Sequence, residues 1–307
     1  TLIIQKPTGS KLTLAKEFTV QDYMWNFPQQ YGLWSPADIT TALWLDAADA
    51  STITESGGAV TVWTDKSGNG HNATADGNPT YSATGMSTNK PAVQLDGTGD
   101  GFVSSITSIG SFNALDVYMV TQTTAVAAAD TNTGFFWGYG NVGTAGGGNP
   151  ANRGIALISG TGSLSGELIT FSFENTSFNG GRLGSSTYTR AANTAQILNS
   201  KNSSSGTSLF ANGSQVNINL ENQITTFTNT APSAVGYTLD NNFYMGAIRT
   251  GGTLAYSLDI KFAEIIASST LLSTLNRQRI EGYLAHKWGL TANLPADHPY
   301  KTVEPTP

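Results

Sequence analysis

Residues 209–220, Leu209-Phe210-Ala211-Asn212-Gly213-Ser214-Gln215-Val216-Asn217-Ile218-Asn219-Leu220, decide the fold class of this chain. From Val216 to Leu220 large apolar residues alternate with polar ones, as in a strand with one solvated face. The pair Asn212-Gly213 accepts the positive φ angles of a tight hairpin turn. The stretch therefore predicts a β-hairpin whose second strand is 216–220.

Similar short segments recur along most of the chain. Residues 169–174 alternate in the same way, and Gly, Asn, Ser and Pro separate the candidates. The further predicted strands are 42–45, 60–63, 92–95, 117–121, 135–137, 154–158, 242–247 and 258–266. Many short strands with little helical periodicity between them indicate an all-β fold, an antiparallel sandwich or barrel.

One helix is expected near the C-terminus, over 273–288. Its apolar positions follow a helical stripe from Leu272 to Trp288, Ser273 is placed to cap the start, and Gly289 to end it. Prolines at 295 and 299 then forbid a regular helix, which predicts a tail extended over the surface.

The composition of the 307 residues excludes several classes of protein. Only 12% are charged, the net charge is −6, and basic clusters are missing, which argues against nucleic acid as a partner. The absence of cysteine removes disulfides, thiolate zinc sites and cysteine nucleophiles. The sequence shows neither a signal peptide nor an apolar run long enough to span a bilayer, so membrane insertion is not expected. A first residue Thr1 fits a protein made without a leader, and equally one whose leader was removed.

Residues 1–38 read as an N-terminal arm ahead of a domain over 39–307. Large aromatic residues, which bury much apolar area when they find a partner, are concentrated there. They are Phe18, Tyr23, Trp25, Phe27, Tyr31 and Trp34. The arm either packs on its own domain or docks on another subunit, and the sequence leaves both open.

Three motifs together resemble a known family. They are Trp34-Ser35-Pro36-Ala37-Asp38 with Ala42-Leu43-Trp44-Leu45-Asp46-Ala47, then Val62-Trp63-Thr64-Asp65-Lys66-Ser67-Gly68-Asn69-Gly70-His71, and Ile280-Glu281-Gly282-Tyr283-Leu284-Ala285-His286-Lys287-Trp288-Gly289-Leu290. The chain from about Trp34 to Lys301 resembles laminin-G-like, concanavalin-A-like jelly-roll domains of bacteriophage virion and bacterial surface proteins. The resemblance implies a two-sheet antiparallel sandwich with one C-terminal helix, and glycan binding or a structural role on a particle or cell surface. Asn276 departs from the family, which usually has a capping Glu there.

Catalytic machinery is not expected. A glycosidase of this superfamily needs carboxylates on alternate positions of one strand, whereas the glutamates here are isolated from one another. The three histidines are scattered over a turn, a helix and a tail, and no Gly-x-Ser-x-Gly elbow is present.

A calcium loop is one interpretation of residues 65–76. Asp65, Ser67 and Asn69 stand at alternate positions, Gly70 is sixth, and Asp76 is twelfth, which is the spacing of oxygen ligands around a hard cation. The alternative is an ordinary tight turn, which selects the same residue types. Calcium is the only cofactor that the sequence suggests.

A glycan site needs an aromatic face beside amides. Trp137 and Tyr139 border a Gly-rich segment, and nearby turns offer Asn175, Asn179, Asn241 and Asn242. The alternative for Trp137 is a place in the core, because sandwich cores also use Trp and Tyr.

The interpretation favoured by the sequence is a non-enzymatic bacteriophage virion protein, in a tail fibre, a tail tip or a capsid decoration, with a lectin-like domain. It is expected to bind other virion proteins through the arm. It is also expected to bind host or environmental glycans and to associate with further copies of itself. The alternative is a secreted bacterial adhesin or carbohydrate-binding module at the cell surface. A glycoside hydrolase comes third.

Overall fold

The fold is described from a computed structural model of the chain. The structure describes residues 3–5, 11–13, 32–106, 114–124, 134–140, 154–159, 168–173, 182–185, 188, 190–203, 206–221, 242–250 and 253–307. Two compact units are present, one of residues 1–33 with 306–307 and one of Trp34–Pro305. The first contains the hairpin β1 (Ile3–Gln5) and β2 (Lys11–Thr13).

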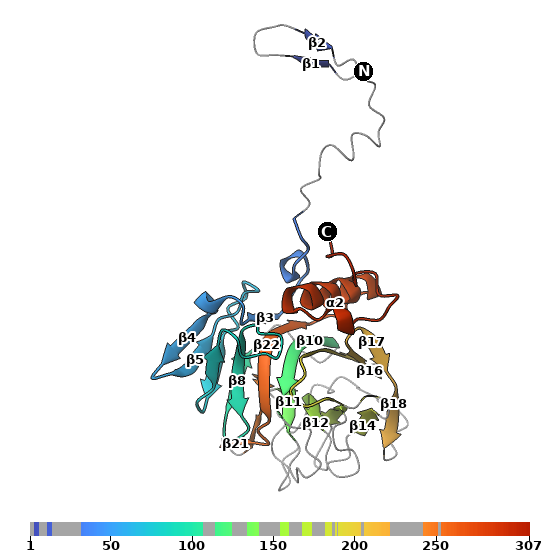
Figure 1. The fold of residues 1–307 in the computed structure, drawn as a ribbon. Helices are drawn as coiled ribbons and strands as arrows, with labels where there is room; N and C mark the ends of the chain where they lie inside the picture. Colours follow the sequence, from blue (N-terminus) through green and yellow to red (C-terminus); the bar gives the residue numbers. More distant parts are fainter. Residues whose placement is uncertain are drawn as a thin grey trace, which may run out of the picture. The chain divides into compact units, whose positions relative to one another are not determined.

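The second unit is a sandwich of two antiparallel sheets (Figure 1). One sheet runs β17 (Ser214–Val216), β16 (Gly206–Ala211), β15 (Gln196–Ser203), β10 (Ala114–Thr123), β22 (Asp259–Ser268), β8 (Ala92–Asp96) and β7 (Thr80–Ser82), and β3 (Leu43–Asp46) also pairs with β22. The other runs β18 (Ile218–Glu221), β14 (Arg182–Ser185), β13 (Leu168–Phe173), β12 (Gly154–Ser159), β11 (Phe135–Gly140), β19 (Asn242–Met245), β9 (Gly101–Ser105), β6 (Ala73–Asp76), β5 (Ala59–Trp63) and β4 (Ile53–Ser56). The predicted antiparallel sandwich is confirmed.

The predicted hairpin is confirmed at its turn and corrected in its second strand. Asn212 (φ 49°) and Gly213 (φ 81°) join β16 to β17, as the Asn-Gly pair predicts. The expected strand 216–220 is not continuous, because β17 ends at Val216 and β18 begins at Ile218 in the other sheet. The chain therefore crosses between the sheets at Asn217, a change that the unbroken alternation of the sequence conceals.

The centre of the sandwich is the pairing of β10 with β22. Both strands are buried along nearly their whole length. A strand that is buried on both faces needs a layer on each side. The opposite sheet is one layer, and the helix α2 (Thr274–Trp288), which contacts β10 and β15, is the other (Figure 1).

The helix matches its prediction, while the tail does not. The Ser273 side chain accepts a hydrogen bond from the Asn276 N–H at 3.2 Å, and Gly289 ends the helix at φ 73°. The tail was expected to lie extended on the surface, but it forms the short helix η5 (Thr291–Asn293) and further turns, with Leu294 and His298 buried. The tail packs because His298 reaches Glu281 of the helix at 3.2 Å.

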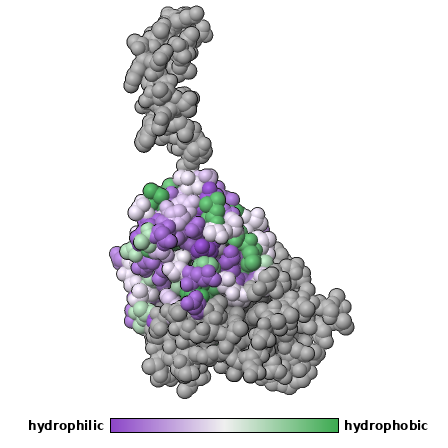
Figure 2. All heavy atoms as spheres, turned by 90° about the vertical axis from the view of Figure 1, so that its right-hand side faces the viewer, coloured by the Kyte–Doolittle hydropathy of each residue, from purple (hydrophilic) through white to green (hydrophobic). Residues whose placement is uncertain are grey.

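One face of the described part is largely hydrophilic. In the face drawn in Figure 2, hydrophobic residues occur in small separate groups among polar ones. Within the described residues, no helix is long and apolar enough to cross a membrane.

Candidate functional site

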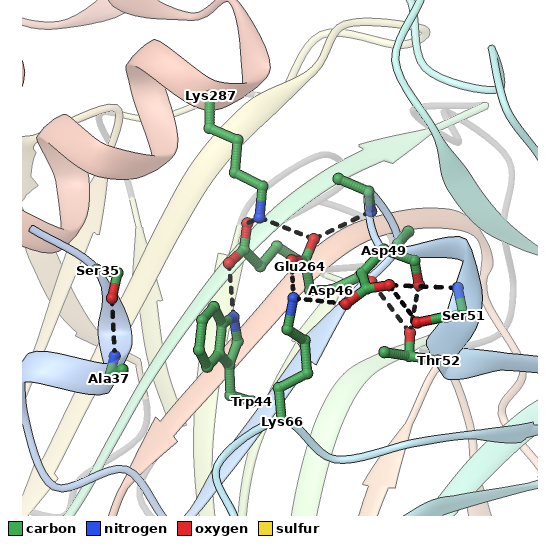
Figure 3. Close-up of polar contacts among 12 residues, drawn as sticks. Ser35, Ala37, Trp44, Asp46, Asp49, Ser51, Thr52, Lys66, Glu264 and Lys287 are labelled. Atoms are coloured by element: carbon green, nitrogen blue, oxygen red, sulfur yellow. Dashed lines mark hydrogen bonds and ion pairs between the residues drawn. The ribbon is translucent and has the colours of Figure 1, made fainter. Parts of the chain in front are cut away.

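A buried carboxylate, Glu264, lies on β22 beneath the helix α2 (Figure 3). Its Oε1 accepts hydrogen bonds from the Trp44 Nε1–H at 2.7 Å and the Tyr283 hydroxyl at 3.0 Å. Its Oε2 accepts from the Trp288 Nε1–H and the Lys287 ammonium, both at 2.7 Å. Four donors from β3 and α2 thus converge on a side chain that is 0% exposed.

The ion pairs continue outward from Glu264 in alternating sign. Asp46 lies opposite Glu264 in the β3–β22 pairing, and the Lys287 Nζ contacts its Oδ1 at 2.8 Å. The Lys66 Nζ contacts Asp46 Oδ2 at 2.9 Å and Asp49 Oδ2 at 3.0 Å. We call Glu264, Lys287, Asp46, Lys66 and Asp49 the charged network. It connects the helix, the sheet and the loop that contains Lys66.

The electrostatics of the charged network favour a structural role. Burial raises the pKa of Glu264, and the nearby Lys287 opposes that effect. Burial alone would lower the pKa of Lys66, but its hydrogen bonds to Asp46 and Asp49 outweigh burial and raise it. A carboxylate whose two oxygens already accept four hydrogen bonds has no lone pair left for a substrate. The geometry of Glu264 therefore fits the docking of a helix on a sheet and not acid–base chemistry on an external substrate.

The sequence motifs supply most of the charged network, but sequence reasoning missed Glu264. Asp46, Lys66 and Lys287 of the network, and the Trp44 indole that donates to Glu264, all lie in the motifs that carry the family resemblance. By sequence alone, Glu264 is one of several glutamates that are isolated from one another. Its place inside the apolar run Phe262-Ala263-Glu264-Ile265-Ile266 was the available signal, because a buried charge requires partners.

The calcium interpretation of Asp65 is wrong. Asp65 Oδ1 accepts hydrogen bonds from the backbone N–H groups of Trp44 and Ser67, both at 2.9 Å. Its Oδ2 accepts from the Ser67 hydroxyl at 2.7 Å and from the His71 N–H at 3.0 Å. The carboxylate is thus filled by protein donors and fastens its loop to β3.

Of the other three predicted calcium ligands, Ser67 reaches Asp65 as a hydrogen-bond donor, and Asn69 and Asp76 are engaged elsewhere. The Asn69 amide nitrogen, and not its oxygen, points into the loop and donates to the Thr41 carbonyl and the Ser67 hydroxyl, both at 2.8 Å. Asp76 lies in β6, opposite Gly101 of β9. Among the residues described, no group of three or more acidic or histidine side chains is arranged to hold a metal ion. The turn interpretation accounts for these residues.

We therefore expect calcium to have no effect on stability. Thermal unfolding should give melting temperatures within about 1 °C of each other in 5 mM EDTA and in 5 mM CaCl₂, a calcium concentration about five hundredfold above the weakest sensor-type dissociation constant. A rise of several degrees in calcium that Asp65→Asn abolishes would contradict this account.

The predicted glycan-stacking residues are core residues. Trp137 and Tyr139 are both 0% exposed. The Trp137 ring stacks on Phe243 at 5.7 Å between centroids, and the Tyr139 hydroxyl donates to the Ile106 carbonyl at 3.1 Å. Neither ring presents a face to a ligand, so this prediction is wrong for both.

Of the four predicted asparagines only Asn242 can be placed. It lies half-buried on β19, and its amide donates to the Tyr244 hydroxyl at 3.4 Å. Asn175, Asn179 and Asn241 lie outside the described residues.

The arm prediction is corrected at Trp34. This residue belongs to the sandwich unit, is 2% exposed, and packs edge-on against Tyr283 with ring centroids 6.2 Å apart. Its N–H donates to the Pro305 carbonyl at 3.0 Å. Ser35 then caps the short helix η1 (Pro36–Asp38) by accepting from the Ala37 N–H (Figure 3). The other predicted arm residues, Phe18, Tyr23, Trp25, Phe27 and Tyr31, lie outside the described residues.

A second buried acid, Asp116 on β10, holds the segment before α2. Its Oδ1 accepts from the Asn199 amide at 2.6 Å, and its Oδ2 accepts from the Leu272 N–H at 3.1 Å and the Tyr118 hydroxyl at 3.2 Å. Burial raises the pKa of Asp116 to about 6, although the hydrogen bond from Asn199 favours the charged form.

Asp116 is expected to make the protein less stable as the pH rises. Its ordinary pKa is 3.8, so between about pH 4 and 6 the folded state binds more protons than the unfolded state, and the free energy of unfolding falls through this window. The loss is at most about 3 kcal/mol. In urea unfolding, the free energy of unfolding of the wild type should fall relative to that of Asp116→Asn as the pH rises from 4.5 to 7. Glu264 is present in both proteins and cancels, so parallel curves would contradict the assignment.

Comparison with known proteins supports the fold. No protein-family model matches the chain, and no curated protein matches it. Trypanosoma rangeli sialidase in complex with sialic acid has a similar structure, with a TM-score of 0.50 and 13% identity over 80% of this chain and 33% of that chain. A mutant of this sialidase displaying trans-sialidase activity gives 0.51 and 11% over 81% and 33%.

A third similar structure is the receptor binding domain of botulinum neurotoxin mosaic serotype C/D, with a TM-score of 0.50 and 14% identity over 80% of this chain and 51% of that chain. The chain thus spans about a third of the sialidases and about half of the neurotoxin domain. Likeness at this identity concerns the fold alone, and it agrees with the β-sandwich.

Proposed function

We propose that this chain is a non-enzymatic, glycan-binding surface protein of a bacteriophage particle, in a tail fibre, a tail tip or a capsid decoration. The non-enzymatic part of the proposal rests on one observation, which is that buried carboxylates of the sandwich are occupied by hydrogen bonds from the protein itself. Glu264, Asp65 and Asp116 all have both oxygens engaged by protein donors. Glycoside hydrolysis by the usual route needs two carboxyl groups that face the substrate. Carboxylates that are held by protein donors stabilise the sandwich, and a stable sandwich suits a binding protein.

The solved structures add support for binding. One is named a receptor binding domain, and another is a sialidase in complex with sialic acid. Each shares only part of its length with this chain, so their activities are not transferred. The laminin-G-like motifs of the sequence point the same way, because that resemblance implies a lectin-like domain at a particle or cell surface.

The N-terminal arm is proposed to attach the sandwich to the particle and to other copies of the chain. Five large aromatic residues precede the buried Trp34, namely Phe18, Tyr23, Trp25, Phe27 and Tyr31. Aromatic side chains bury large apolar areas when they dock on a partner.

Deletion of residues 1–33 tests this attachment. The deletion must stop before Trp34, because that side chain is part of the sandwich core. The shortened protein is expected to keep its melting temperature and its glycan binding, and to be missing from purified particles that incorporate the full chain. Unchanged incorporation would overturn the role of the arm.

Immunogold labelling of a lysing source culture tests the location. Label on capsids or on tail ends is the expected result. Label on intact cells with unlabelled particles would overturn the virion proposal and favour the secreted adhesin.

A further inference from the structure

An amine and two carboxylates meet beneath the helix α2. The Lys287 Nζ lies 2.8 Å from Asp46 Oδ1 and 2.7 Å from Glu264 Oε2. Asp46 and Glu264 are directly opposite each other in the β3–β22 pairing, and Lys287 reaches both from the helix (Figure 3). Amide formation needs these three groups, which are a nucleophilic nitrogen, a carboxyl carbon and an acid that moves protons between them.

The contact is largely shielded from solvent. The side chains of Glu264 and Asp46 are 0% and 5% exposed, and that of Lys287 is 21% exposed. The ring centroids of Tyr283 and Trp288 lie 5.1 Å and 5.3 Å from the Lys287 Nζ. Apolar surroundings disfavour the charged forms of an amine and a carboxyl group, and these two groups react with each other in their neutral forms. Their fixed positions also remove the entropic cost of an encounter.

Glu264 is placed to accept the proton that Lys287 must lose. One of the four donors on Glu264 is the Lys287 ammonium itself, so this proton is already hydrogen-bonded to Oε2. Burial raises the pKa of Glu264, although Lys287 opposes the effect, and a raised pKa makes a carboxylate a better proton acceptor. The other three donors, on Trp44, Tyr283 and Trp288, hold the carboxylate in this orientation.

A second lysine, Lys66, contacts the other oxygen of Asp46 and has a different environment. Its Nζ lies 2.9 Å from Asp46 Oδ2 and 3.0 Å from Asp49 Oδ2, and the Asp49 side chain is 37% exposed. Burial alone would lower the pKa of Lys66, but its hydrogen bonds to the two acids raise it, so this lysine stays an ammonium. A fixed cation beside Oδ2 stabilises the negative charge that develops there when Cγ is attacked.

We propose that the Lys287 amine and the Asp46 carboxyl group form an intramolecular amide bond, with Glu264 as the proton carrier. The Lys287 Nζ passes a proton to Glu264 and attacks Asp46 Cγ. The C–N bond forms, the bond from Cγ to Oδ1 breaks, and Oδ1 leaves as water with the two protons that Nζ gives up, one of them by way of Glu264. Oδ2 remains as the amide oxygen beside Lys66, Glu264 ends ionised as it began, and the step consumes no oxidant or cofactor.

Asp46, and not Glu264, is the carboxyl group that reacts. The amide N–H takes the place of one carboxylate oxygen. At Glu264 Oε2 this would set a donor against the buried Trp288 indole N–H, which now donates to that oxygen at 2.7 Å. At Asp46 Oδ1 the facing donor is the Ala48 N–H at 3.0 Å, and Ala48 is exposed, so its N–H can bond to water instead.

The bond would connect the two ends of the sandwich unit covalently. β3 is the first strand after Trp34, and α2 follows the last strand. Tension on the residues before β3 would then be carried to the helix by an amide bond rather than by the hydrogen bonds of one short strand. This inference goes beyond the proposed glycan binding and does not depend on it.

The mass of the denatured full chain tests the bond. The wild type should weigh about 18 Da less than its sequence, because one water is released. Dehydration at an Asp-Gly pair such as Asp76-Gly77 also releases one water, so a tryptic digest must place the loss. We expect no cleavage after Lys287 and one branched fragment that joins Lys287 to Asp46. A wild type with the full mass of its sequence, or a fragment that joins Lys66 to Asp46, would overturn the proposal.

Two matched lysine variants test the assignment of the groups. Lys287→Arg and Lys66→Arg each keep a positive charge beside Asp46, but only the first removes the proposed nucleophile. Lys287→Arg should have the full mass of its sequence, and Lys66→Arg should still show the loss. Glu264→Gln should also have its full mass, because a neutral amide does not accept the proton. A loss of water that persists in Lys287→Arg would overturn the proposal, and the wild-type fragment decides it even where a variant does not fold.

Discussion

Replacement of Glu264 with alanine is expected to lower the free energy of unfolding by about 3–5 kcal/mol. Glu264 is 0% exposed, and the change leaves the indole N–H groups of Trp44 and Trp288 without their acceptor and the Lys287 ammonium with Asp46 as its remaining anionic partner. A buried donor that loses its partner keeps the full cost of its desolvation. Since these donors belong to β3 and α2, we expect the helix to be the first element to detach.

Asp49→Ala is the control for the Glu264 experiment. Asp49 belongs to the same charged network, but its side chain is 37% exposed and contacts Lys66 at 3.0 Å. An exposed ion pair of this kind contributes about 0–1 kcal/mol. The Asp49 side chain also accepts from the Ser51 N–H at the start of the short helix η2 (Ala50–Thr52), a cap that contributes about 1 kcal/mol. Urea unfolding of both variants should separate them clearly at equal m-values. Equal losses for Glu264→Ala and Asp49→Ala would contradict the view that Glu264 is the centre of the network.

Replacement of Gly246 with alanine is expected to lower the free energy of unfolding by about 2–4 kcal/mol, because backbone strain and overpacking of the core add. Gly246 has φ 76°, where a side chain is strained. A Cβ there would also lie 2.1 Å from Leu95 Cδ2, inside the main core. The Gly246 backbone also joins β11 to the segment before β22, since its N–H donates to the Phe136 carbonyl at 3.1 Å and its carbonyl accepts from the Leu258 N–H at 2.7 Å.

A second variant, Gly57→Ala, separates the backbone strain from the overpacking. Gly57 has φ 62°, and an added Cβ would meet no atom within 4 Å. Gly57→Ala therefore carries the backbone strain alone and should cost about 1 kcal/mol. The difference between the two variants, measured by urea unfolding, gives the cost of overpacking. A Gly246→Ala loss no larger than that of Gly57→Ala would mean that the core near Leu95 is looser than described.

Alternation and turn residues predicted the strands where one face is polar and the other apolar. They failed at β15, whose sequence Gln196-Ile197-Leu198-Asn199-Ser200-Lys201-Asn202-Ser203 reads as a polar segment. Asn199 and Asn202 are almost fully buried there. Their burial is tolerated because the Asn199 amide donates to Asp116 and the Asn202 amide donates to the Ser200 hydroxyl. A prediction from hydrophobic alternation misses a buried strand whose polar side chains form hydrogen bonds with one another.

The candidate site was less predictable than the fold, because exposure depends on tertiary packing. Trp137 looked suited to a ligand by its residue type and its Gly-rich surroundings, yet its strand is central and its ring is buried. Glu264 was equally hidden, because its four donors come from β3 and α2, and only the folded chain brings those elements together around β22.

The central claim is that the sandwich binds glycans without cleaving them. The most direct measurement is a glycan array with the full chain, followed by an assay for released reducing sugar on every glycan that binds. We predict retention of at least one class of glycan with no sugar release. Release that depends on a single acidic residue would contradict the non-enzymatic account, and the absence of binding to any glycan would contradict the lectin-like function itself.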